Sequence, residues 1–150
     1  MGIPERWKRC TPVPPDINAR LKSLTPIFQR FNVTLAYLFG SLADGRAADD
    51  VDLAVLTPGG AEELRFAVTQ ALGTDRLDLL DLAAASPCWR FEVVSSGKLI
   101  YKRDDESENR FEHAALREYK DTAYLRRRHD AVLRQRIAEW SSNARASQNA

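Results

Sequence analysis

Two apolar runs joined by a short polar loop constrain the fold of this chain more than any other feature. The runs lie at 33–39 and 51–56, and both are short and rich in β-branched or aromatic residues, which predicts buried strands. The first run ends at Gly40-Ser41, and the second begins directly after Asp50. We therefore expect one strand that ends in a tight turn and a second strand that begins at a carboxylate.

The rest of the chain alternates predicted helices and strands. Helical spacing is found at 16–31 with a bend or break at Pro26, at 61–72 before Gly73, and at 86–94, while further strands are predicted at 76–82 and 98–101. Such alternation predicts an α/β (α+β) fold with a small mixed sheet flanked by helices.

The C-terminal part is predicted to be helical. Residues 104–140 form either one long helix or two stacked helices, with acids in the first turns and arginines later, as the helix dipole favours. The expected organisation is an irregular leader at 1–15, a domain at 16–103, a helical extension at 104–140 packing on it, and a flexible tail at 141–150.

Composition narrows the class of protein. Hydrophobic residues make up 44% and charged residues 29%, which is typical of a globular protein, and no apolar run is long enough to span a membrane. The first residues lack the pattern of a secretory signal, so a cytoplasmic location is expected, with Cys10 and Cys88 as free thiols. The net charge of +1 excludes a globally basic nucleic-acid binder.

Asp50 and Asp52 are the first candidate site residues. Side chains alternate along a strand, so these two carboxylates should point to the same side, while Val51 and Leu53 point to the opposite, apolar side. Two neighbouring carboxylates repel each other unless a cation compensates them. Magnesium, which prefers oxygen ligands and commonly bridges carboxylates and phosphates, is the expected cation.

A third carboxylate is expected from the predicted strand at 76–82. This strand carries Asp78 and Asp81 on opposite faces, so only one of them should face the site, and we expect Asp78. Three carboxylates would hold two metal ions for an in-line displacement at phosphorus, and Asp78 with Asp52 beside it could also accept the attacking proton. The alternative is that these aspartates are solvent-facing residues of an edge strand.

Gly40 and Ser41 are the candidate phosphate-binding residues. Glycine lets the backbone approach a phosphate closely, and Ser41 offers a hydroxyl and an N–H group at an expected helix N-terminus. Arg46 in the following loop either contacts phosphate or is an ordinary solvated residue.

Taken together, these motifs resemble those of the polymerase-β-like nucleotidyltransferases, whose signature is Gly-Ser, a loop, Asp-x-Asp and a later acid. More closely, the stretch 35–101 is similar to a minimal nucleotidyltransferase (MNT) domain, and 111–128 is similar to the end of MNT antitoxins. The resemblance implies an antitoxin that transfers AMP from ATP to a tyrosine of a HEPN ribonuclease toxin. It also implies that Gly40 and Ser41 hold the triphosphate and that the metal ligands are Asp50, Asp52 and Asp78.

Two other functions remain open at this point. The chain could be a binding-only antitoxin that blocks the toxin, or a nucleotidyltransferase acting on a small molecule such as an aminoglycoside. A patch of Leu133, Ile137 and Trp140 is a candidate for contact with the partner. The arginines at 126–128 leave nucleic-acid contact open without favouring it, since a charge run is usually a solvated face.

Overall fold

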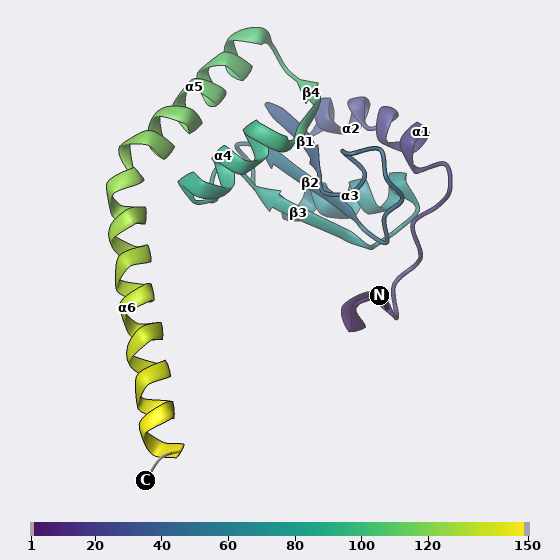
Figure 1. Cartoon of the computed structure of the whole chain (residues 1–150). Helices are drawn as coiled ribbons and strands as arrows, with labels where there is room; N and C mark the ends of the chain where they lie inside the picture. Colours follow the sequence, from purple (N-terminus) through teal and green to yellow (C-terminus); the bar gives the residue numbers. More distant parts are fainter. Residues whose placement is uncertain (1, 149–150) are drawn as a thin grey trace.

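A mixed sheet forms the centre of the molecule in the computed structural model, which describes residues 2–148. Its strands are β1 (Leu35–Phe39), β2 (Val51–Leu56), β3 (Leu77–Asp81) and β4 (Lys98–Lys102), in the spatial order β3-β2-β1-β4 (Figure 1). β1 pairs antiparallel with both β2 and β4, whereas β2 pairs parallel with β3. The parallel pair matters for the site because it places equivalent ends of β2 and β3 side by side.

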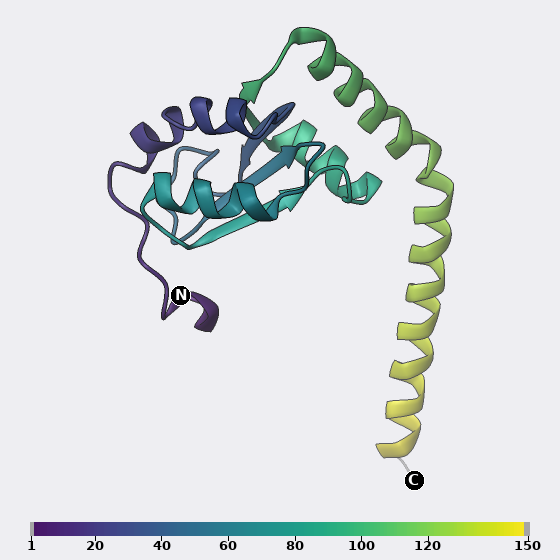
Figure 2. The same ribbon diagram turned by 180° about the vertical axis from the view of Figure 1, so that it is seen from behind.

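Helices cover both faces of the sheet. One face carries α1 (Ile17–Lys22), α2 (Thr25–Arg30) and α3 (Glu62–Leu72), and the other carries α4 (Pro87–Ser96) and α5 (Asp105–Asp121) (Figures 1 and 2). The alternation of β2 separates these layers: Val51, Leu53 and Val55 pack towards α1–α3, while Ala54 lies in the smaller cluster towards α4 and α5. The chain therefore has two apolar cores, one on each side of the sheet.

The last helix, α6 (Ala123–Gln148), leaves the body of the protein (Figure 1). Thr122 separates it from α5, and the Thr122 hydroxyl donates to the carbonyl oxygen of Glu118. None of the described side chains of α6 is buried. Among residues 2–148, no helix is both long enough and apolar enough to cross a membrane.

The predicted fold class is confirmed, but several segments differ from expectation. Residues 16–31 are interrupted as expected, but the break lies at Ser23 and Leu24, between α1 and α2. Pro26 lies in the first turn of α2, where its missing N–H costs nothing. The helical extension packs on the domain mainly through α5. Helix continues to Gln148 where a flexible tail was expected, and residues 149 and 150 lie outside the described range. The leader is not wholly irregular, because it contains a short 3₁₀ helix, η1 (Glu5–Trp7), with Trp7 buried.

Candidate functional site

Three carboxylates meet at one end of the parallel strand pair. Asp52 of β2 is paired in register with Asp78 of β3, and Asp50 directly precedes β2. The three side chains each offer an oxygen such that all three oxygens lie within 4.8 Å of one another. The structure thus brings together Asp50, Asp52 and Asp78, hereafter the acidic cluster, as the strand alternation predicted.

Asp81 lies outside the acidic cluster. It pairs with Val55 further along β2, and its Oδ1 accepts a hydrogen bond of 3.0 Å from the backbone N–H of Ala83. The choice of Asp78 over Asp81 therefore agrees with the geometry, and Asp81 has a local role in the turn that follows β3.

Burial and mutual repulsion change the acidity of Asp52. Its partial burial, followed by the charges of Asp50 and Asp78, raises the pKa of Asp52 to about 6, while the guanidinium of Arg6 acts in the opposite direction. A carboxyl of this pKa is a better proton acceptor near neutral pH than an ordinary aspartate. The same repulsion makes a bound cation favourable.

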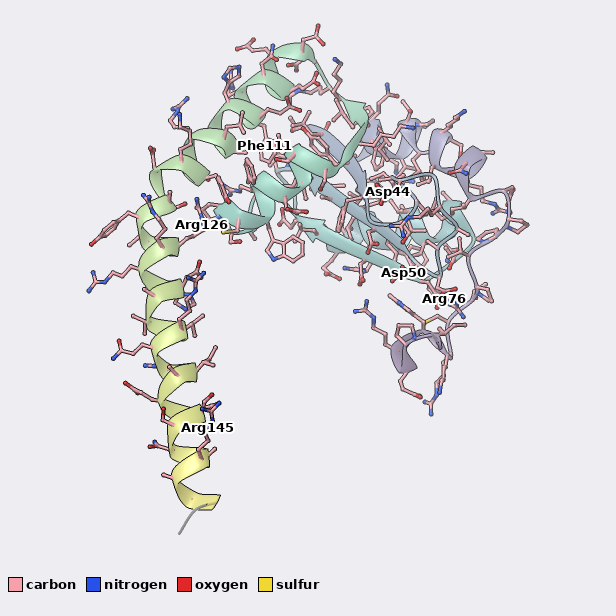
Figure 3. All side chains as sticks on the ribbon, in the orientation of Figure 1. Asp44, Asp50, Arg76, Phe111, Arg126 and Arg145 are labelled. Atoms are coloured by element: carbon pink, nitrogen blue, oxygen red, sulfur yellow. The ribbon has the colours of Figure 1, made fainter. Side chains whose placement is uncertain are left out.

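Arg6 and Trp7 contact the acidic cluster, and sequence reasoning did not identify them. Arg6 Nη2 lies 2.7 Å from Asp78 Oδ2 and 3.9 Å from Asp50 Oδ2, and Trp7 Nε1 donates to Asp50 Oδ2 over 3.0 Å. Figure 3 shows Asp50 at the end of the sheet that faces this N-terminal segment. Trp7 is buried, and no local sequence pattern indicated that its indole N–H would donate to a carboxylate far along the chain.

Gly40 lies against the acidic cluster and has a conformation that glycine favours. Its φ is +71°, and a Cβ at this position would overlap Oδ2 of Asp52. Ser41 begins a turn rather than a helix, because its carbonyl oxygen accepts from the N–H groups of Asp44 and Arg46. The expected helix N-terminus at Ser41 is therefore wrong, and any phosphate contact here would come from turn residues.

Arg46 is directed towards its own loop. Its Nη2 lies 2.9 Å from Asp44 Oδ2, and both side chains are exposed. In this structure Arg46 is thus an ion-paired surface residue, and its contact with phosphate stays a prediction.

A cleft of about 300 Å³ adjoins the acidic cluster. It is lined by Asp52 and Asp78 together with Phe39, Arg65 and Trp89. Trp89 is half exposed, and Arg65 is fixed by donating to the carbonyl oxygens of Leu77 and Leu79 on the outer edge of β3. The cleft combines apolar walls with a charged end, which is the usual composition of a small-ligand site.

The acidic cluster fits a divalent metal. Its ligands are carboxylate oxygens, which are the donors that Mg²⁺ prefers, and a cationic guanidinium already lies against two of them. Of the candidate metal ligands named from the sequence, all three are present in this one group.

Comparison with known families identifies the domain. The model of the family described as polymerase beta, nucleotidyltransferase, matches residues 22–106, more than half of the chain. The chain belongs to this nucleotidyltransferase family. The matched part of the nucleotidyltransferase contains Gly40, Ser41 and the acidic cluster, whereas η1 and α6 lie outside it. No curated protein matches the chain.

Solved structures share the fold of this nucleotidyltransferase. One is the complex of tri-AMPylated Shewanella oneidensis HEPN toxin with MNT antitoxin, at 23% identity and a TM-score of 0.61, covering 80% of this chain and 98% of the other. Another is a toxin–antitoxin with AMP-PNP, at 25% identity and a TM-score of 0.61, covering 79% and 98%. A third, the toxin–antitoxin MntA–HepT, has 24% identity, a TM-score of 0.59 and coverages of 80% and 98%. The predicted resemblance to MNT antitoxins is confirmed at the level of the fold.

Proposed function

We propose that this nucleotidyltransferase is an antitoxin that transfers AMP from ATP to a tyrosine hydroxyl of a HEPN ribonuclease toxin and thereby neutralises it. The observation that carries the proposal is the acidic cluster, assembled by β2 and β3 inside a polymerase beta nucleotidyltransferase domain. The similarity to MNT chains solved with HEPN toxins, one of them tri-AMPylated, supports the choice of acceptor.

The acidic cluster would hold two magnesium ions. When bound, these ions would neutralise the triphosphate and lower the pKa of the attacking hydroxyl. Gly40 and Ser41, at the end of β1 beside Asp52, would let the backbone approach the triphosphate, and the cleft between Phe39 and Trp89 would receive part of the substrates.

The reaction balances without a further co-reactant. The tyrosine oxygen forms a bond with the α-phosphorus of ATP, the bond between the α-phosphorus and the bridging oxygen breaks, and pyrophosphate leaves. The hydroxyl proton passes to a carboxylate of the acidic cluster. Asp78, with Asp52 beside it in register, is the proposed acceptor of this proton.

Helix α6 is the proposed contact surface for the toxin. Leu125 and Ile137 are each 61% exposed, and Trp140 is 78% exposed. Large apolar side chains of this kind are typical anchors of protein interfaces, and an isolated helix gives them no cover within the chain. We infer a hetero-oligomer with the toxin in the cytoplasm, with no membrane contact and no expected nucleic-acid contact.

The proposal is tested by incubating the protein with a HEPN toxin and magnesium ATP, followed by intact-mass spectrometry and an assay of toxin ribonuclease activity. We expect adenylate-sized mass increments on the toxin and loss of ribonuclease activity. The variant Asp50→Ala/Asp52→Ala should abolish both effects but still bind the toxin. Asp81→Ala, which removes a carboxylate outside the acidic cluster, is the matched control and should retain both.

Occlusion of the toxin is the second candidate function, and the free apolar surface of α6 favours it. A toxin that is bound and silenced without any mass increment, by the wild type and by Asp50→Ala/Asp52→Ala alike, would establish occlusion in place of catalysis.

A further inference from the structure

The N-terminal segment covers the acidic cluster with a cation of its own. Arg6 Nη2 contacts Asp78 Oδ2 at 2.7 Å and approaches Asp50 Oδ2 at 3.9 Å, while Trp7 Nε1 donates to the same Asp50 oxygen at 3.0 Å. The Arg6 guanidinium also lies 4.6 Å from the centroid of the Trp7 ring. Two residues of η1 therefore engage two of the three carboxylates that would bind metal.

The segment is tethered so that these contacts form readily. The backbone N–H of Thr11 donates to Asp75 Oδ1 over 2.7 Å, and the Thr74 hydroxyl donates to the carbonyl oxygen of Thr11 over 2.6 Å. Trp7 is only 7% exposed. These contacts hold the segment against the loop before β3, so Arg6 is present at a high effective concentration beside the acidic cluster.

Arg6 itself is weakly held. Its side chain is 60% exposed and that of Asp78 is 41% exposed, and ion pairs with this exposure contribute little to stability because water and salt screen them. A guanidinium and a divalent ion cannot share these oxygens favourably, since like charges repel at such a distance. Arg6 can thus leave at low cost, whereas buried Trp7 stays with Asp50.

We propose that Arg6 is a built-in competitor of the metal: it offsets part of the negative charge of the acidic cluster in the resting protein and must be displaced before a divalent cation binds Asp78 and Asp50. Trp7 is a positioning residue that anchors η1 and orients Asp50. The inference rests on the proposed metal-dependent function of the acidic cluster. It adds regulation of metal binding by η1, whose residues 5–7 lie outside the part of the chain that the family model matches.

The test is a manganese titration of the full-length protein without nucleotide, in which electron paramagnetic resonance measures the free ion. Arg6→Ala should tighten manganese binding by about two- to five-fold, the range expected for loss of an exposed ion pair. Arg9→Ala is the matched control, because it removes an exposed arginine of the same segment and the same charge. It should change the affinity by less than Arg6→Ala does.

Equal manganese affinity in the wild type and Arg6→Ala would overturn the proposal while leaving AMP transfer standing. Weaker binding of AMP-PNP by Arg6→Ala with unchanged manganese affinity would also overturn it, and would assign Arg6 to the phosphates instead. Manganese binding by neither protein would overturn it together with the metal-dependent function. Loss of toxin modification in an otherwise metal-binding protein would contradict only the proposed function.

Discussion

At the scale of single residues, the site depends on how close Gly40 lies to Asp52. Glycine at position 40 accepts a φ of +71° and leaves space for the Asp52 carboxylate. Asp52 in turn is paired in register with Asp78 and contributes to the group of three carboxylates, so its position affects whether they converge. Small changes at either residue should therefore affect function more than folding.

Gly40→Ala tests this dependence. The positive φ should cost about 1 kcal/mol of folding free energy, because a Cβ is disfavoured in the left-handed region. The added methyl group should also rotate the Asp52 carboxylate out of the acidic cluster, so transfer of AMP should fall at least about ten-fold. Chemical denaturation measures the loss of stability, and toxin modification measures the loss of transfer. The control is Gly59→Ala, because a Cβ added at Gly59 meets no atom within 4 Å beyond its chain neighbours. Normal activity in Gly40→Ala would contradict the account.

Asp52→Asn should stabilise the metal-free protein at neutral pH. Burial and the neighbouring carboxylates raise the pKa of Asp52 from 3.8 to about 6, so folding favours its neutral form. The stabilisation from the protonated carboxyl is complete below pH 4 and is lost as the pH rises through 6, whereas an amide keeps it. We expect the free energy of unfolding of Asp52→Asn to exceed that of the wild type by about 1 to 3 kcal/mol at pH 7 and to equal it near pH 4. Unfolding curves at both pH values decide this, and an equal gain in Asp81→Asn would refute the assigned cause.

At the scale of elements, a partly buried side-chain hydrogen bond joins β1 to α5. The Tyr37 hydroxyl donates to Glu112 Oε1 over 3.0 Å, and Tyr37 is only 1% exposed. Burial, followed by this bond, raises the pKa of Tyr37, so the phenol stays protonated and remains a donor. The contact fixes α5 over the second apolar core, on the same side of the sheet as the acidic cluster.

Tyr37→Phe should therefore lower the free energy of unfolding by about 1 kcal/mol, because the half-buried Glu112 carboxylate loses its donor. Urea denaturation measures the loss. Combining Tyr37→Phe with Glu112→Leu should recover part of it, since neither polar group is then left unpaired. An unchanged midpoint in Tyr37→Phe would show that the hydrogen bond contributes nothing.

Elements also show what the sequence can predict. The strands and the opposite faces of Asp78 and Asp81 were predictable because side-chain alternation is a local pattern. The parallel pairing that places Asp78 beside Asp52 is a long-range contact, which the local pattern does not specify. The helix expected at Ser41 was wrong because three successive turn hydrogen bonds closed the loop instead. The contacts of Arg6 and Trp7 with Asp78 and Asp50 were not predictable, since they depend on how the leader folds back over distant strands.

At the scale of the whole molecule, the body and α6 are distinct parts. The sheet, its five flanking helices and the loops between them form both apolar cores, and α6 extends away from them (Figures 1 and 2). The continuation of α6 to Gln148 was not predicted, because the residues of this segment are small and polar. In the structure, serine hydroxyls of the segment donate to carbonyl oxygens one turn earlier, and its alanines favour helix. The exposed apolar residues of α6 are therefore available for contact with a partner protein.

Ending the chain after Arg127 tests this division. The shortened protein keeps Arg126, whose guanidinium lies 3.6 Å from the centroid of the Tyr119 ring. Its melting temperature should change by less than about 2 °C, because the removed side chains are not buried. Binding to the HEPN toxin should be lost, as measured by size-exclusion chromatography of the mixture. Wild-type binding by the shortened protein would exclude the part of α6 beyond Arg127 as the contact surface.

The most direct test of the central claim is to follow ATP labelled at either the α- or the γ-phosphate during incubation with magnesium and the HEPN toxin. Nucleotidyl transfer at the acidic cluster predicts that the α-label becomes attached to the toxin, that the γ-label is released in pyrophosphate, and that Asp50→Ala/Asp52→Ala abolishes both. Attachment of the γ-label, or attachment of neither label by a protein that binds the toxin, would contradict the account.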